Sequence, residues 1–307
     1  MIAVIGATGF TGRRLVVHLR QQYPDQELVA IVRSASQHEA LTNVTFRTAD
    51  LSDMGSLREA FRGARQVVSV VSLGSGYAAN LVSAIQAAAP DHAIFFSTTS
   101  IFTKVAPRSR NVFVEAEHMI VSSDIPATIF RPTMIYGRPG DRNIERLLRF
   151  IGRSPFMPIV GSGAALQQPV HVDDLTAAVD SALGRSNTIG WSYNLPGPRP
   201  MRFTELVAEA AQAVGRRPIF VHLPLGLTAL AVGAWAVTGL APRIRPAQVL
   251  RLAEHKQVDP SRAVQHFGYS PREFGLGVRE EARLLGLTHS DGSQGKKHSR
   301  RFSPKRG

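Results

Sequence analysis

The chain has 307 residues, 44% of them hydrophobic and 19% charged, a composition ordinary for one large globular domain or two coupled ones. It contains no Cys, which excludes disulfides, thiolate catalysis and cysteine-metal sites. The net charge of +13 and the pI of about 11.0 indicate an anionic partner.

Part of that charge is local. The segment 288–307 carries six Lys or Arg and one acid, so it supplies +5 of the +13. It has almost no apolar residues to bury, and we expect a disordered, solvated tail; contact with a nucleic acid or an anionic membrane is the alternative. The chain opens on the strand-like run "MIAVIG" with no basic segment or cleavage site, which predicts no signal peptide and a cytoplasmic location.

Apolar runs and helical patterns alternate along the first 137 residues. Strands are predicted at 2–5, 27–34, 44–51, 66–73, 93–100 and 127–137, and helices at 13–23, 56–63, 78–90 and 115–124. Such alternation is typical of βαβ units, and the Val/Ile-rich strands fit burial on both faces. We therefore expect an α/β fold, a doubly wound parallel sheet that binds its ligand at the carboxyl ends of the strands.

The pattern changes after Gly137. A basic amphipathic helix follows among Pro/Gly turns, then a strand leading into a helix that Asp173 or Asp174 could cap, and a helix over 203–215. We expect a nucleotide-binding domain at 1–137 plus 169–195, and a smaller C-terminal substrate-binding domain at 138–168 and 196–287.

The run Leu223–Pro242 has no charged residue over 20 positions, long enough to cross a bilayer. Its three glycines favour a helix packed against protein. Peripheral membrane contact stays open, because the "RIR" that follows is basic.

The clearest motif is "GATGFTG", which places Gly6, Gly9 and Gly12 between the first strand and the first helix. Gly6 permits a tight turn, Gly9 lets the backbone approach a pyrophosphate, and Gly12 lets helix and strand pack closely. The N–H groups at the helix start then hold the anion.

The second strand ends in "IVRS" rather than in an acid. Arg33 can pair with a ribose 2′-phosphate, Ser34 can donate to it, and Arg13 could add a second cation, so we expect NADP, with NAD as the alternative. Asp50 ends the third strand, where it could accept from an adenine amino group or only cap a turn.

Six segments resemble, in this order, the extended short-chain dehydrogenase/reductase superfamily, the group of the nucleotide-sugar epimerases and dehydratases. They are "GATGFTGRRLV", "ADLSD", "FSTTSIF", "AEHMI", "IFRPTMIYG" and "PVHVDDL", and the resemblance covers roughly 1–287. The cofactor-binding set is then expected to be Gly6, Thr8, Gly9, Phe10, Gly12, Arg13, Arg33, Ser34, Asp50, Leu51 and Pro132.

The resemblance implies a catalytic hydroxyl after the fifth strand, an acid/base Tyr, and a Lys four residues after that Tyr. Thr99 matches the hydroxyl. Aligning "EAEHMI" puts Ser109 and Phe113 at the Tyr and Lys positions, and no Y-x-x-x-K occurs anywhere in the chain. Without a tuned acid/base the general acid–base factor of about 10²–10⁴ is lost. Tyr136 is one candidate substitute donor, and Tyr77 another.

The resemblance assigns substrate contacts to Arg142, Asn143, Gln167, Gln168 and His171, and Tyr77 is a further candidate for substrate contact. A metal site is not expected, because Asp173 and Asp174 are adjacent and point in different directions. We expect an NAD(P)-binding oxidoreductase or epimerase acting on a small molecule, nucleotide-linked or quinone-like, and no specific nucleic acid. The alternative is a non-catalytic NADP-binding sensor, assembly factor or respiratory-complex accessory subunit; a homodimer is left open.

Overall fold

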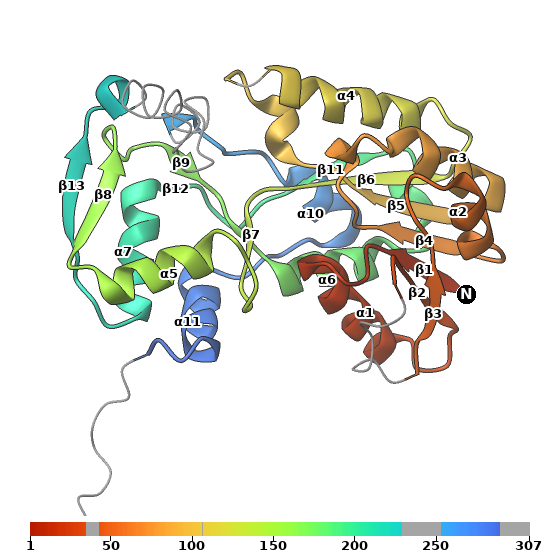
Figure 1. Ribbon diagram of the computed structural model, residues 1–307, viewed down its shortest axis with the longest axis horizontal. Coiled ribbons are helices and arrows are strands. Elements are labelled where there is room, and N and C mark those ends of the chain that lie inside the picture. The colour runs from red at the N-terminus through yellow and green to blue at the C-terminus, as the bar shows by residue number, and fades with distance from the viewer. Residues whose placement is uncertain (35–42, 106, 229–252, 289–307) are drawn as a thin grey trace, which may run out of the picture.

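The centre of the structure is a parallel sheet of seven strands (Figure 1). The computed structural model describes residues 1–34, 43–105, 107–228 and 253–288. The strand order is β11-β6-β5-β4-β1-β2-β3. The strands are β1 (Ile2–Ile5), β2 (Leu28–Val32), β3 (Thr45–Thr48), β4 (Gln66–Ser69), β5 (His92–Phe96), β6 (Ala127–Pro132) and β11 (Ser192–Leu195).

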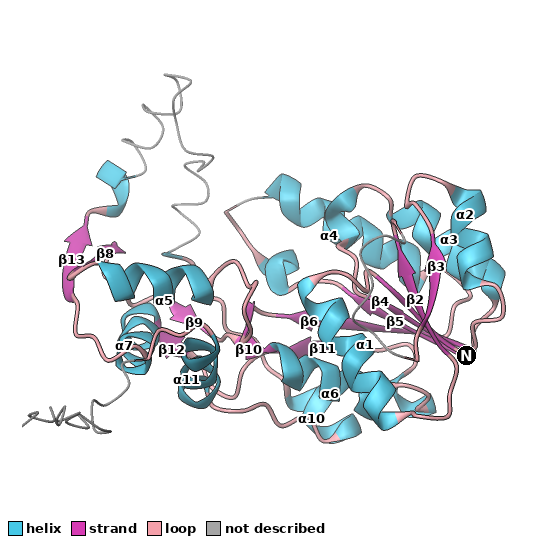
Figure 2. Ribbon diagram, turned by 60° about the horizontal axis from the view of Figure 1, so that its bottom comes forward, coloured by secondary structure: helices cyan, strands magenta, loops and turns pink. Residues whose placement is uncertain are grey.

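Helices cover both faces of this sheet (Figure 2). One face carries α1 (Phe10–Gln22), α6 (Val172–Ala182) and α10 (Ser261–Phe267); the other carries α2 (Met54–Phe61), α3 (Ala78–Ala88) and α4 (Pro107–Val121). Successive side chains of a strand point to opposite faces. Ile2 and Val4 therefore join the core under α1, while Ala3 and Ile5 join the core under α2 and α3. Burial on both faces explains why β1 is apolar at every position.

A second group of elements has a core of its own. It contains α5 (Ile144–Arg153), α7 (Phe203–Ala213) and α11 (Phe274–Leu284), with the paired strands β8 (Phe156–Val160) and β13 (Ile219–Leu223). Two short strand pairs surround or join it: β7 (Ile135–Tyr136) with β10 (Val170–His171), and β9 (Leu166–Gln167) with β12 (Met201–Arg202). The described residues also form short 3-10 turns: η2 (Leu73–Ser75), η3 (Thr99–Phe102) and η4 (Ser186–Thr188).

The α/β fold and the doubly wound parallel sheet are confirmed, and several element boundaries differ from those predicted. The long strand expected at 127–137 is two strands, β6 and β7, because the chain leaves the sheet after Pro132. The helix expected at 115–124 begins earlier, at Pro107. Helix α10, within the segment expected in the smaller domain, packs Phe267 against Phe130 and Tyr193 of the main sheet.

The expected cap of α6 is also different. His171, not Asp173 or Asp174, is the N-cap residue, and its Nδ1 accepts from the Asp173 N–H at 3.2 Å. Asp173 instead pairs with Arg14 of α1 and with Arg138, while Asp174 pairs with Arg272 at 2.9 Å. The two carboxylates thus tie α6 to α1 and to the segment before α11. Most of the uncharged run Leu223–Pro242, and nearly all of the basic tail, lie outside the described residues.

Candidate functional site

The turn between β1 and α1 is built to leave a helix start open to an anion. Gly6 has a φ of +84°, a conformation that only glycine adopts without strain. A Cβ added at Gly12 would lie 2.1 Å from the Gly6 carbonyl oxygen, so helix and turn touch there. Gly9 is the N-cap, no side chain caps the helix, and the first turn contains no acid. The free N–H groups and the positive end of the helix dipole suit a diphosphate.

Arg33 lies immediately after β2, exposed, at the same edge of the sheet. Asp50, just after β3, is the nearby acid, and its Oδ1 accepts from the N–H and the hydroxyl of Ser52 at 2.8 and 2.5 Å. These hydrogen bonds, aided by the positive charge of Arg33, lower the pKa of Asp50. The carboxylate is therefore turned to its own loop, and no acid among the described residues ends β2 itself.

Thr8 and Arg13 are exposed beside this turn, and Phe10 begins α1. Leu51 is half-buried, packs against the core under α2 and α3, and accepts from the Asn80 side chain through its carbonyl at 2.9 Å. The structure thus brings the residues expected to bind the cofactor to one edge, at the carboxyl ends of β1, β2 and β3.

Thr99 lies at the carboxyl end of the next strands in the sheet. It begins η3 directly after β5, and its hydroxyl donates to the Pro132 carbonyl at the end of β6, at 3.3 Å. The neighbouring Thr98 caps the same turn by accepting from the Ser100 N–H. Thr99 also lines a cavity of about 50 Å³. The hydroxyl is therefore half-buried, with its orientation set by Pro132.

Helix α4 holds the positions where the resemblance would put the Tyr and the Lys. The ring of Phe113 fills the second position: a Cβ added at Gly74 in η2 would lie 2.7 Å from its Cζ. Nearby, Arg131 of β6 pairs with Glu117 through two oxygens of the carboxylate, and its guanidinium lies 5.8 Å from the Phe102 ring centroid. In α4, Phe113 thus packs on η2 and Glu117 pairs with Arg131. No described residue of this helix offers an ammonium group to the sheet edge.

Tyr136, the expected alternative acid, is not brought to Thr99. Its side chain has 0% exposure, its hydroxyl donates to the Phe274 carbonyl at 3.3 Å, and its ring packs on His171 and Phe274. Burial raises the pKa of the phenol well above its ordinary value. This position in the second core argues against the acid role expected for Tyr136, because neither substrate nor solvent reaches its oxygen.

Gln168 and His171 were expected to contact substrate, and both are buried. Gln168 joins two segments: its amide nitrogen donates to Gly197, and its amide oxygen accepts from the Val258 N–H. His171 packs on Gly137, and burial lowers its pKa to about 4, so the ring is neutral near pH 7. Both residues thus hold the backbone between the two groups of elements.

Three of the other residues expected to contact substrate are exposed. Tyr77 is the N-cap of α3, in the loop that follows β4. Arg142 and Asn143 precede α5, whose first turn is capped by the Asp141 carboxylate. A Cβ at Gly140 would lie 3.9 Å from the Phe10 ring, so this loop approaches the start of α1.

One segment that lies beside Thr99 has no sequence motif that predicts its place at the site. Residues 254–258 line the cavity beside Thr99. Glu254 accepts from the Thr103 hydroxyl and the Lys104 N–H at 2.6 and 2.7 Å, and His255 Nδ1 accepts from the Leu166 N–H at 3.2 Å. The segment thus bridges η3 and β9. It lies about 150 residues further along the chain than Thr99, a distance that sequence spacing alone cannot close.

Comparison with known proteins agrees with this geometry. Residues 6–149 match the family model of NAD(P)H-binding domains. Quinone oxidoreductase 2 of Escherichia coli is 25% identical over 230 residues, which cover 73% of this chain and 78% of that protein. Ceramide reductase of Caulobacter vibrioides is 28% identical over 307 residues, which cover 94% of this chain and 93% of that protein.

A solved structure shows the same fold. The Citrobacter sp. triphenylmethane reductase complexed with NADP(H) matches with a TM-score of 0.71 at 22% identity, over 91% of this chain and 99% of that chain. Residues 6–149 therefore match an NAD(P)H-binding domain, and the chain has the same Rossmann-type α/β fold as this solved structure.

Proposed function

We propose that the chain is an NADPH-dependent reductase of a conjugated carbonyl compound, of the quinone or enone kind. The observation that carries the proposal is the position of Thr99: its half-buried hydroxyl stands at the carboxyl ends of β5 and β6, on the same sheet edge as the open start of α1. A nicotinamide nucleotide bound along that edge supplies a hydride.

The preference for NADP rests on Arg33. An acid at this position would accept from both ribose hydroxyls and repel a 2′-phosphate, whereas an exposed guanidinium can pair with that phosphate through two N–H groups. We propose that the remaining contacts to the cofactor come from Gly6, Thr8, Gly9, Phe10, Gly12, Arg13, Ser34, Asp50, Leu51 and Pro132.

The proposed substrate class follows from the lack, among the described residues, of a positioned acid next to Thr99. Reduction of a carbonyl places an electron pair on oxygen, which must then take a proton. A simple ketone yields a strongly basic alkoxide and needs a positioned acid, while a quinone yields the much less basic oxygen of a phenol. Thr99 can orient the acceptor oxygen by a hydrogen bond, and water in the cavity beside it can deliver the proton.

The names of the relatives support a reductase. Two are a quinone oxidoreductase and a ceramide reductase, and a third is a triphenylmethane reductase complexed with NADP(H). An epimerase must withdraw a proton from a sugar hydroxyl. Tyr136 is buried and the exposed Tyr77 has no lysine four residues after it, so the described residues offer no tyrosine–lysine pair for that step. A non-catalytic role is less favoured, since it gives no part to Thr99.

The test is a turnover assay of the purified full-length protein with NADPH and three acceptors: a benzoquinone, an enone and a saturated ketone. We expect NADPH oxidation above the protein-free rate with the conjugated acceptors and little with the ketone. Binding of NADPH with no turnover of any acceptor would refute the reductase and leave the sensor.

A further inference from the structure

The second group of elements ends in a strand pair that exposes an apolar face. Strands β8 and β13 are parallel, with Ile219 opposite Phe156 and Val221 opposite Pro158, and paired residues of neighbouring strands share a face. Their exposed fractions include 61% for Ile219, 53% for Phe156 and 41% for Val221. On the opposite face Met157 and Ile159 of β8 are buried, Phe220 of β13 is half-buried and His222 is exposed. This pair lies at the end of the molecule farthest from the main sheet (Figures 1 and 2).

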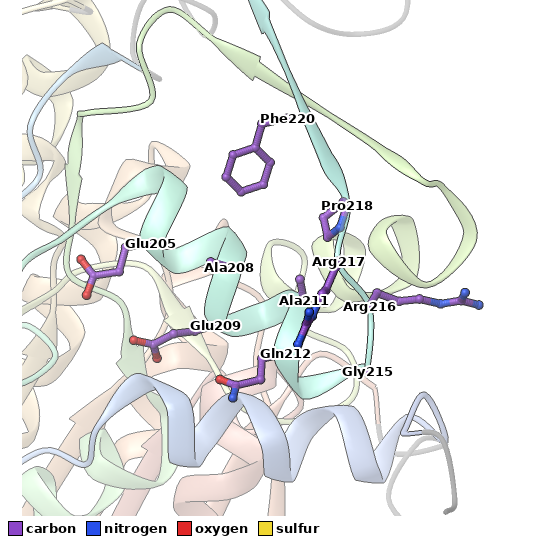
Figure 3. A pocket seen from close by; sticks show the side chains of 10 residues that line it. All are labelled: Glu205, Ala208, Glu209, Ala211, Gln212, Gly215, Arg216, Arg217, Pro218 and Phe220. Atoms are coloured by element: carbon purple, nitrogen blue, oxygen red, sulfur yellow. The ribbon is translucent and has the colours of Figure 1, made fainter.

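Three arginines stand at the start of these strands. Arg153 ends α5 shortly before β8, and Arg216 and Arg217 precede β13. Because the strands are parallel, both turns lie at the same end of the pair, and all three arginines line one cavity of about 230 Å³. Figure 3 shows the Arg216 side chain extending away from α7, while the Phe220 ring points back toward that helix.

These three arginines lack acidic partners among the described residues. The acids closest to them along α5 and α7 are engaged elsewhere: Glu145 pairs with Arg149 at 2.8 Å, and Glu205 and Glu209 pair with Arg199 at 2.6 and 3.1 Å. Elsewhere in the described chain most buried or half-buried arginines, such as Arg14 and Arg131, are paired. The three guanidinium groups at this end of the strand pair thus have no ion pair among the described residues, while Glu205 and Glu209, which line a pocket with Arg216 and Arg217, pair with Arg199 instead.

The basic C-terminal segment starts at the same place. Arg153 and Arg216, together with Leu287 and Thr288, line a further cavity of about 220 Å³. The segment from Thr288 onward carries the +5 found in the sequence. The basic C-terminal segment therefore begins beside Arg153 and Arg216.

We propose that this end of the molecule is a docking surface for an anionic lipid bilayer. It consists of the apolar residues Phe156, Ile219 and Val221 and the basic residues Arg153, Arg216 and Arg217, which we name the basic-apolar end. Aliphatic side chains next to unpaired cations fit a headgroup region, where the apolar groups enter the acyl boundary and the guanidinium groups meet lipid phosphates. Nucleic acid is less suited, since aliphatic groups offer no stacking platform for bases. A second copy of the chain would bring the same unpaired charges together.

This surface differs from the one that the sequence indicated. For the uncharged run Leu223–Pro242 we expected a helix packed against protein, with peripheral membrane contact left open, and most of that run lies outside the described residues. Among the described residues no helix is long and apolar enough to cross a bilayer. The basic-apolar end needs no spanning segment. It is also independent of the proposed reductase activity.

The test is co-sedimentation of the full-length protein with vesicles of phosphatidylcholine alone or of equimolar phosphatidylcholine and phosphatidylglycerol. We expect binding to the anionic vesicles, weakened by added salt because exposed charges are screened. Each cation near an anionic surface strengthens binding by a factor of about five, so R153Q/R216Q/R217Q should weaken partitioning by about a hundredfold. F156S/I219S should also weaken it while leaving the salt dependence in place.

Two full-length control variants keep the proposal falsifiable. R58Q/R62Q/R185Q removes the same charge from the opposite domain and should leave binding unchanged. A variant with all six Lys and Arg of 288–307 changed to Gln measures the tail alone. Equal binding to neutral vesicles, loss in the tail variant but none in R153Q/R216Q/R217Q, or equal loss in the matched control would each overturn the proposal. So would binding to an RNA oligonucleotide without binding to anionic vesicles.

Discussion

Two side chains, Thr99 and Arg33, define what the sheet edge can do chemically. Thr99 has its hydroxyl oriented by the Pro132 carbonyl, and Arg33 is exposed at the end of β2. Phe113, at the position where the resemblance would put the Lys, packs on Gly74, and Tyr136, one of the two expected proton donors, is buried in another core. The site therefore holds a hydrogen-bonding hydroxyl without a tuned acid.

Thr99 can be tested with a matched pair of variants. T99V keeps the shape of the side chain and removes the hydroxyl, and T99S keeps the hydroxyl. We expect T99V to lower kcat/KM for a quinone by about a hundredfold, the usual loss for a donor to developing charge on oxygen. T99S should retain most of the activity, and both should bind NADPH as the unchanged protein does. Equal rates for T99V and the unchanged protein would remove Thr99 from the reaction.

At the scale of elements, the contact between β1 and α1 depends on one missing side chain. A Cβ at Gly12 would meet the Gly6 carbonyl oxygen at 2.1 Å, and nothing nearby can yield except backbone. G12A should therefore distort the start of α1 and weaken NADPH binding at least tenfold. G152A offers a comparison, because Gly152 has open space around it, is not among the glycines with positive φ, and lies outside the nucleotide edge. Unchanged NADPH affinity in G12A, measured by titration, would contradict the role given to this turn.

Helix α11 carries a buried acid that costs stability at neutral pH. Glu281 has 0% exposure, and its Oε2 accepts from the Gly137 N–H at 3.1 Å. Burial and the nearby Asp141 raise its pKa to about 10. The folded chain holds the proton that the unfolded chain releases, so stability is present below pH about 4.5 and is lost as pH rises toward 10.

Glu281→Gln should remove this dependence. A glutamine is neutral at every pH, so its free energy of unfolding should exceed that of the unchanged protein by an amount that grows with pH. The growth is on the order of 1 kcal/mol per pH unit between about 5 and 9. Urea unfolding at several pH values measures it. A constant difference between the two proteins would show that Glu281 ionises normally.

The sequence predicted the elements of the main sheet better than the site between the two groups of elements. Ile2–Ile5 and the glycine turn are local patterns, and the structure has them where predicted. Thr99 was predicted because the sequence places it at the end of a strand, and it lies three residues after β5 ends at Phe96. The roles of Tyr136 and His171 were not predictable in this way, because their burial depends on Phe274 and other residues of α11. The Glu254–Val258 segment was missed for the same reason: only tertiary contacts place it beside Thr99.

For the whole molecule, buried ionisable groups predict the pH of greatest stability. Burial lowers the pKa of both His92 and His171 to about 4, so both are neutral when folded. The unfolded chain takes up those protons below pH about 6.5, and stability falls as pH decreases from there toward 4. Glu281 acts in the opposite direction as pH rises. We expect greatest stability at about pH 6.5, where protonation of the two histidines in the unfolded chain balances the proton that Glu281 holds in the folded chain, and at a higher pH in E281Q.

The surfaces proposed to bind the cofactor and the membrane lie in different parts of the molecule. The nucleotide edge lies on the main sheet, and the basic-apolar end lies on the strand pair farthest from it (Figure 1). Variants of one surface should therefore leave the other intact, so cofactor binding and vesicle binding can be measured on the same proteins.

The most direct test of the central claim is a fluorescence titration of the full-length protein with NADPH and NADH, repeated with Arg33→Asp. We predict that NADPH binds at least tenfold more tightly than NADH, because each interaction of a guanidinium with a phosphate contributes over 1 kcal/mol. Arg33→Asp should reverse that order, since its carboxylate repels the 2′-phosphate and accepts from ribose hydroxyls. Failure of either nucleotide to bind, or equal affinities that Arg33→Asp does not change, would contradict the account.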